Sequence, residues 1–87
     1  MDKGLEEFFK TGSLKGIPAQ SVDRIERMLD RLDTATVPED MDLPGYKFHE
    51  LKGKRKGVYS VTVTGNWRIT FEFDGGDAVD VKLEDYH

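Results

Sequence analysis

The hydrophobic period of the chain changes near residue 46, and this change constrains the fold more than any other feature of the sequence. Before it, apolar residues recur at three- and four-residue intervals, at Val22, Ile25, Met28, Leu29 and Leu32, which is typical of one face of an amphipathic helix. After it, apolar and polar residues alternate, as they do in a β-strand with one buried face. The helical stripe must therefore cover the apolar face of a sheet.

The alternating part predicts four strands, over residues 46–51, 59–63, 67–73 and 78–83. Short turns such as Gly65-Asn66 make successive strands antiparallel neighbours. Two helices are predicted before the sheet, a short one within residues 5–11 and a longer one after Pro18. The predicted fold class is α+β, with two N-terminal helices packed on one face of a mostly antiparallel sheet of about four strands.

Length and composition limit the class of protein. A chain of 87 residues forms one domain, 1–87, and its 37% hydrophobic and 34% charged residues are typical of a globular protein rather than a disordered or membrane protein. The chain lacks cysteine, which excludes disulfides, zinc-thiolate sites and a cysteine nucleophile. Neither a secretory signal nor an apolar run of about 20 residues is seen, so we expect a cytoplasmic protein without membrane contact.

The charge of the chain is unevenly distributed. The formal net charge is −4, yet residues 47–56 hold five Lys or Arg against one Glu. A local positive potential, rather than the net charge, decides where a phosphate group binds. The basic segment predicts contacts to RNA through Lys47, Lys54, Arg55 and Lys56, and the alternative is a solvated surface loop.

The polar face of the predicted sheet offers a place for chemistry. Arg68, Thr70 and Ser60 alternate with apolar residues, so they are expected on an open face away from the helices. Arg68 could instead pair with Glu72 on its own strand. Trp67 could stack on a base, although its position in the alternation favours packing in the core.

Metal-free cleavage of RNA needs a base for the 2′-hydroxyl, cations for the charge at phosphorus and an acid for the leaving oxygen. Imidazole suits the proton transfers because its pKa lies near working pH. The two histidines do not have the spacing of a metal-binding motif, so we expect no metal or cofactor. The candidate residues are His49, Lys52, Arg68, Asp85, Tyr86 and His87. The alternative interpretation of His49 and His87 is an ordinary surface residue and a frayed chain end.

Several motifs occur together in the second half of the chain. The segments Leu51-Lys52-Gly53 and Gly65-Asn66-Trp67-Arg68, together with the terminal Asp85-Tyr86-His87, resemble the HigB-type toxins, or plasmid-maintenance killer proteins, of the RelE/ParE superfamily. The resemblance covers nearly the whole chain. It implies a RelE-like fold, and it places the six candidate catalytic residues at active-site positions of the family.

The resemblance also implies a function and a set of partners. The function would be that of a toxin of a type II toxin-antitoxin system, a ribosome-dependent endoribonuclease that cleaves messenger RNA in the ribosomal A site, next to 16S rRNA. The partners would be a HigA-type helix-turn-helix antitoxin and, through it, operator DNA. Family members usually begin with a short β-strand, whereas only three residues precede Gly4 here, so this edge strand is expected to be missing.

Two alternatives to the nuclease share its fold. A ParE-like inhibitor of DNA gyrase needs no catalytic imidazole, so His49 and the terminal trio favour the nuclease. An attenuated homologue that only binds its antitoxin is the other alternative.

Overall fold

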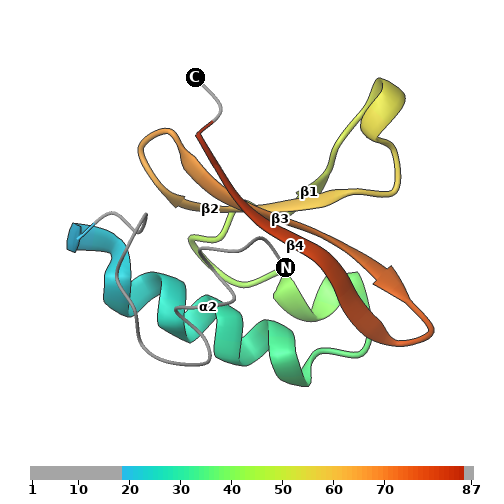
Figure 1. The fold of residues 1–87 in the computed structure, drawn as a ribbon, viewed down its shortest axis with the longest axis horizontal. Coiled ribbons are helices and arrows are strands. Elements are labelled where there is room, and N and C mark those ends of the chain that lie inside the picture. The colour runs from blue at the N-terminus through green and yellow to red at the C-terminus, as the bar shows by residue number, and fades with distance from the viewer. Residues whose placement is uncertain (1–18, 86–87) are drawn as a thin grey trace.

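The computed structural model describes residues 19–85, in which one long helix lies against a four-stranded antiparallel sheet (Figure 1). Helix α2 (Val22–Thr34) follows a 3₁₀ turn, Ala19–Ser21. The strands are, in order across the sheet, β1 (His49–Glu50), β2 (Tyr59–Thr64), β3 (Trp67–Asp74) and β4 (Asp77–Asp85). The predicted α+β class is confirmed.

The predicted helices have different outcomes. The longer one is observed as α2, whereas the short one, within residues 5–11, lies outside the described residues, as does any strand before it. Between residues 19 and 85 no helix is long and apolar enough to cross a membrane.

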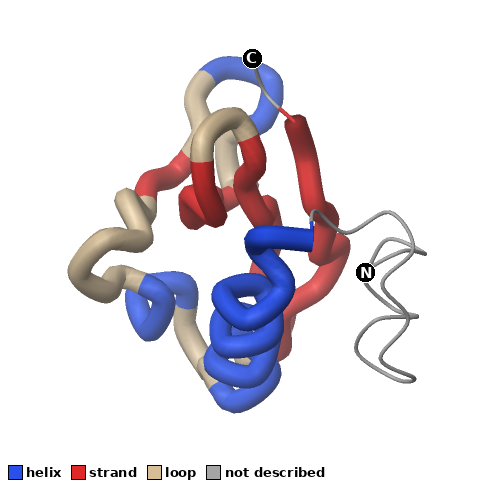
Figure 2. Tube along the Cα trace, turned by 90° about the vertical axis from the view of Figure 1, so that its left-hand side faces the viewer, coloured by secondary structure: helices blue, strands red, loops and turns tan. Residues whose placement is uncertain are grey.

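The core lies between α2 and one face of the sheet, as the side view in Figure 2 shows. The predicted stripe of α2 is confirmed, because Ile25, Met28, Leu29 and Leu32 are all buried. They pack with the buried apolar side chains of the sheet and of the 3₁₀ turn that follows α2, Pro38–Met41. These side chains are Met41, Val61, Val63, Ile69, Phe71 and Val81. Trp67 is half-buried and packs against this core, which confirms the prediction that it serves packing.

The first strand is shorter than predicted. Regular pairing is confined to His49–Glu50, although the prediction began at residue 46. Tyr46 instead lies in a turn, where its N–H donates to the carbonyl of Leu43, and Lys47 has a φ of +51°. A residue in this left-handed region interrupts the regular pairing of a strand, so the regular part of β1 begins only after Lys47. The prediction was wrong here because alternation does not reveal a backbone φ.

Arg24 joins α2 to the segment that leads into β1. Arg24 lies outside the apolar stripe of the helix, yet it is half-buried. Its Nη2 donates to the carbonyl oxygens of Gly45, at 2.8 Å, and Thr62, at 3.2 Å. Its guanidinium carbon lies 5.3 Å from the centre of the Tyr46 ring. These contacts fix the start of the segment that carries His49.

Candidate active site

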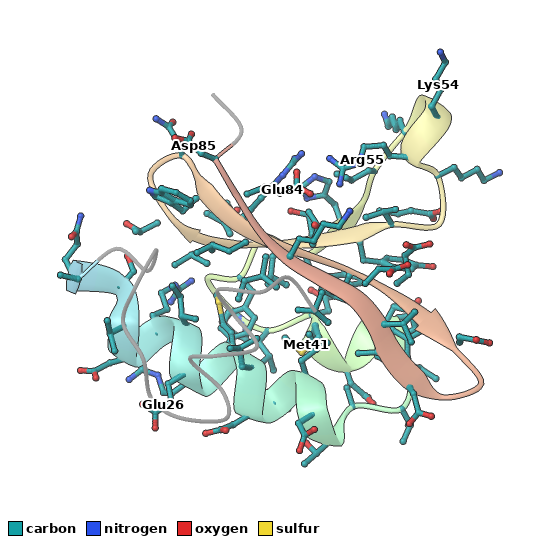
Figure 3. The ribbon with its side chains drawn as sticks, viewed as in Figure 1. Glu26, Met41, Lys54, Arg55, Glu84 and Asp85 are labelled. Carbon is teal, nitrogen blue, oxygen red and sulfur yellow. The ribbon has the colours of Figure 1, made fainter. Side chains whose placement is uncertain are left out.

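The sheet face opposite α2 carries the polar residues that the alternation predicted. Figure 3 shows Glu84 and Arg55 on this side of the sheet, away from α2. Residues paired across antiparallel strands share a face. One row therefore joins His49 of β1, Ser60 of β2 and Thr70 of β3, and the next row joins Arg68 of β3 to Glu84 of β4. The register thus brings one histidine, one arginine and one carboxylate onto the same surface.

This face is less open than predicted. Ser60 is 0% exposed and Thr70 is 1% exposed, so neither can line an open groove. Thr70 is covered by Glu84, whose Oε2 accepts a hydrogen bond of 2.7 Å from the threonine hydroxyl. The prediction of an open concave face was wrong at these two positions, because a strand pattern shows which face a side chain occupies but not what covers it.

Glu84 is the centre of a cluster of charges. Arg55 makes a two-pronged contact with it, from Nη1 to Oε1 at 2.9 Å and from Nη2 to Oε2 at 2.6 Å. Nη2 of Arg68 lies 3.3 Å from Oε1. Arg68 therefore pairs with Glu84 of the neighbouring strand, rather than with Glu72 of its own strand.

The cluster keeps Glu84 ionised. Hydrogen bonds from Arg55, with further ones from Thr70 and Arg68, lower the pKa of Glu84 from 4.5 to about 2. The same contact with Glu84 raises the pKa of Arg55. A permanent negative charge therefore lies between the two arginines.

The basic segment, residues 47–56, runs from Lys47, just before β1, through β1 and into the loop between β1 and β2. It contains a 3₁₀ turn, Gly53–Arg55, and the N–H of Gly57 donates to Glu50 Oε2 at 2.9 Å. The exposed side chains are those of Lys47, Lys52, Lys54 and Lys56. Arg55 instead folds back onto the sheet, while Lys54 points away from it (Figure 3). The predicted RNA-contacting residues thus divide into exposed lysines and one arginine held in an ion pair.

His49 is exposed at the edge strand β1. Its Nδ1 lies 3.0 Å from the carbonyl oxygen of Lys47. A carbonyl oxygen only accepts, so this contact requires a proton on Nδ1, which in a neutral ring leaves the lone pair on Nε2.

The remaining predicted residues lie at the end of β4. Asp85, the last residue of β4, is exposed and pairs in register with Trp67. Tyr86 and His87 lie outside the described residues. Because Arg68 pairs with Glu84, and Glu84 contacts Arg55, the end of β4 lies beside both Arg68 and the basic loop. Within residues 19–85, no three His, Asp or Glu side chains gather closely enough to hold a metal ion.

Glu84 was missed in the sequence as a residue of the site. The signal was present, because Lys82 and Glu84 continue the polar alternation of the last strand onto the face that carries Arg68. A single carboxylate among basic residues does not itself bind phosphate, so the pattern of basic and imidazole side chains did not indicate it.

Comparison with known proteins bears on this site. Over residues 1–87 the chain matches a family model described as the RelE-like toxin of the type II toxin-antitoxin system HigB. It is 51% identical over 85 residues to a Proteus vulgaris protein named Endoribonuclease HigB, which covers 98% of this chain and 92% of that protein. It is 32% identical over 85 residues to Toxin HigB-1 of Vibrio cholerae, and the matched segment covers 95% of this chain and 90% of that protein. The resemblance seen in the motifs is thereby confirmed: this chain belongs to the HigB-like family of RelE-like toxins, which act in type II toxin-antitoxin systems together with an antitoxin.

Proposed function

We propose that this chain is a ribosome-dependent endoribonuclease that cleaves messenger RNA through the 2′-hydroxyl of the RNA itself. The observation that carries the proposal is the register of β4, which brings the start of the Asp85-Tyr86-His87 segment beside Arg68 and the basic loop. The name of the Proteus vulgaris relative supports the activity.

The reaction needs two proton transfers and a stabilised phosphorane. The 2′-hydroxyl loses its proton to a base as its oxygen bonds to phosphorus, and the bond from phosphorus to the 5′-oxygen breaks. An acid donates a proton to that 5′-oxygen. The products are a 2′,3′-cyclic phosphate and a 5′-hydroxyl, so that no water or metal-bound hydroxide enters the bond-breaking step.

His49 is the proposed base. The contact of its Nδ1 with the Lys47 carbonyl leaves the Nε2 lone pair available to accept the 2′-hydroxyl proton. His87 is then the proposed acid. Tyr86 is proposed to stack on a base or orient the RNA, and Asp85 to orient a neighbouring group.

The cations divide into two groups. Arg68 and Lys52 are proposed to neutralise the charge that develops on the phosphorane, because fixed cations in a partly desolvated site stabilise such charge strongly. Arg68 suits this role since its side chain is only 16% exposed. The exposed Lys47, Lys54 and Lys56 are proposed to contact the RNA backbone, including 16S rRNA at the ribosomal A site.

The proposed partners follow from the family. The antitoxin is proposed to be a HigA-type helix-turn-helix protein, through which the toxin associates indirectly with operator DNA. Ribosome and messenger RNA place the proposed activity in the cytoplasm.

The test is cleavage of a messenger RNA in a purified translation system. Arg68→Ala should reduce the cleavage rate about 10²–10³-fold, which is typical for loss of one donor that stabilises the transition state. Arg27→Ala is the matched control, since this exposed arginine lies on α2, on the other side of the sheet. Equal cleavage by wild type and Arg68→Ala would contradict the proposal, and inhibition of gyrase supercoiling without RNA cleavage would favour a ParE-like inhibitor instead.

A further inference from the structure

Glu84 poses an electrostatic problem for the proposed nuclease. Its pKa of about 2 means that its carboxylate is charged at any working pH. It contacts Arg68, the cation proposed to neutralise the phosphorane, through Oε1 at 3.3 Å. A carboxylate at this position repels the phosphate of an incoming RNA and cancels the charge of the arginine beside it.

Arg55 resolves this problem by its geometry. Its two terminal nitrogens face the two oxygens of Glu84 at 2.9 and 2.6 Å, both shorter than the contact from Arg68. Parallel two-pronged contacts are the strongest form of arginine–carboxylate pair. The stronger share of the Glu84 interaction therefore goes to Arg55, and the weaker share to Arg68.

The charge balance of the three side chains shows the consequence. Two guanidinium groups and one carboxylate leave a net charge of +1 at the cluster. Without Arg55 the cluster would be neutral, and Arg68 would be the sole guanidinium contacting Glu84. With Arg55 in place, the charge of Glu84 that faces Arg68 is offset by a second guanidinium.

We propose that Arg55 is a positioning residue that compensates the charge of Glu84, so that Glu84 can hold Arg68 against the sheet without cancelling its charge. This inference rests on the proposed RNA cleavage. It also gives Arg55 a different role from the direct contact to RNA that its place in the basic segment predicted. Lys47, Lys54 and Lys56 keep that direct role, because they are exposed.

The burial of the cluster fits a positioning role. The side chains of Arg68 and Glu84 are 16% and 23% exposed, whereas that of Arg55 is 42% exposed. Arg55 thus forms the outer layer over a nearly enclosed Arg68–Glu84 contact, and Thr70 supports Glu84 from below. Interactions between charges are stronger in such partly enclosed surroundings than in water.

A double-mutant cycle tests the inference. Arg55→Gln, Glu84→Gln and the double variant are compared with wild type by kcat/KM for cleavage in the purified translation system. Arg55→Gln should lower kcat/KM about tenfold, because Glu84 is then left to cancel Arg68. The double variant should have a kcat/KM at least about threefold higher than that of Arg55→Gln, since the uncompensated negative charge of Glu84 is gone. Glutamine at position 84 still offers an oxygen to Thr70.

The competing roles for Arg55 give different patterns. If Arg55 contacts RNA directly, the double variant should be as poor as Arg55→Gln. If the pair only fixes the loop, both single variants and the double variant should be equally poor. Either pattern would overturn the inference. Arg55→Lys separates charge from shape, and it should retain more activity than Arg55→Gln.

Two controls keep this test independent of folding and of the proposed function. Glu26→Gln removes a carboxylate from α2, on the other side of the sheet (Figure 3), and thermal unfolding of each variant shows whether it is folded. If wild type fails to cleave any RNA, the proposed function is wrong. Wild type and the three variants of the cycle are then compared for salt-dependent binding of a short single-stranded RNA. The same recovery in the double variant would support charge compensation, and its absence would overturn it.

Discussion

Glu84→Gln should make the stability of the domain less sensitive to acid. In the folded protein the pKa of Glu84 is lowered from 4.5 to about 2, and the largest cause is its hydrogen bonding with Arg55. A carboxyl whose pKa is lower when folded contributes stability above its unfolded pKa, and this contribution is lost as pH falls through the folded pKa. The window for this group is therefore from about pH 4.5 down to about pH 2.

The expected size follows from the same contacts. A drop in pKa of this extent corresponds to about 3 kcal/mol if the whole interaction counts, because one pKa unit equals about 1.4 kcal/mol. The side chain of Arg55 is 42% exposed, and we expect screening by solvent to reduce the contribution to about 1–2 kcal/mol. In a domain of this size, 1 kcal/mol shifts the melting temperature by about 4–8 °C.

The assay is thermal unfolding of wild type and Glu84→Gln, followed by circular dichroism at intervals from pH 7 to pH 3. At pH 7 the variant should melt about 4–16 °C below wild type. This difference should shrink steadily below pH 4.5, because the unfolded wild-type chain then binds a proton at Glu84 that the folded protein does not bind. Glu26→Gln, on the exposed face of α2, should show little difference at any pH. A gap between wild type and Glu84→Gln that stays constant with pH would refute the reasoning.

Two further predictions concern the packing that positions the site. Arg24→Ala should lower the free energy of unfolding in urea by about 1–3 kcal/mol, because the carbonyls of Gly45 and Thr62 lose a charged donor. The control, Arg27→Ala, should change this free energy by less than about 0.5 kcal/mol. Equal effects of the two substitutions would contradict the role given to Arg24. Met41→Ala should lower the free energy of unfolding by about 2–5 kcal/mol in the same assay, since Met41 is 0% exposed within the core and its truncation leaves a cavity. A decrease below about 1 kcal/mol would show that the 3₁₀ turn Pro38–Met41 is not part of that core.

Much of the fold could be predicted from the sequence because it follows from two periodicities. The apolar stripe of α2 and the alternation in β2 and β3 each have one arrangement that buries their apolar face, and the structure shows that arrangement. In β4 the alternation is interrupted at Asp80, which has a φ of +51°, and Val79 pairs with Glu72 of the polar face. The shortened β1 could not be predicted in the same way. Its start depends on the left-handed backbone of Lys47, and a lysine carries no signal for such a conformation.

The candidate site was predicted less completely, since its key contacts join residues far apart in the sequence. Alternation placed Arg68 on the polar face correctly, and His49 and Lys52 were candidates because of the proton transfer and the positive charge that RNA cleavage needs. The pairing of Arg55 with Glu84 spans 29 positions and depends on how the loop folds over the sheet, which periodicity does not contain. The same contact explains why Thr70 is buried rather than open to solvent.

The chemistry of the cleaved RNA ends tests the central claim most directly. The proposed reaction uses the 2′-hydroxyl, so fragments from wild-type cleavage on translating ribosomes should carry a 5′-hydroxyl and a 2′,3′-cyclic phosphate or the 3′-phosphate derived from it. A single 2′-deoxynucleotide at the mapped cleavage position should abolish cutting there. Fragments with a 5′-phosphate and a 3′-hydroxyl, or unchanged cutting of the deoxy-substituted RNA, would contradict the mechanism proposed for His49, Arg68 and the end of β4.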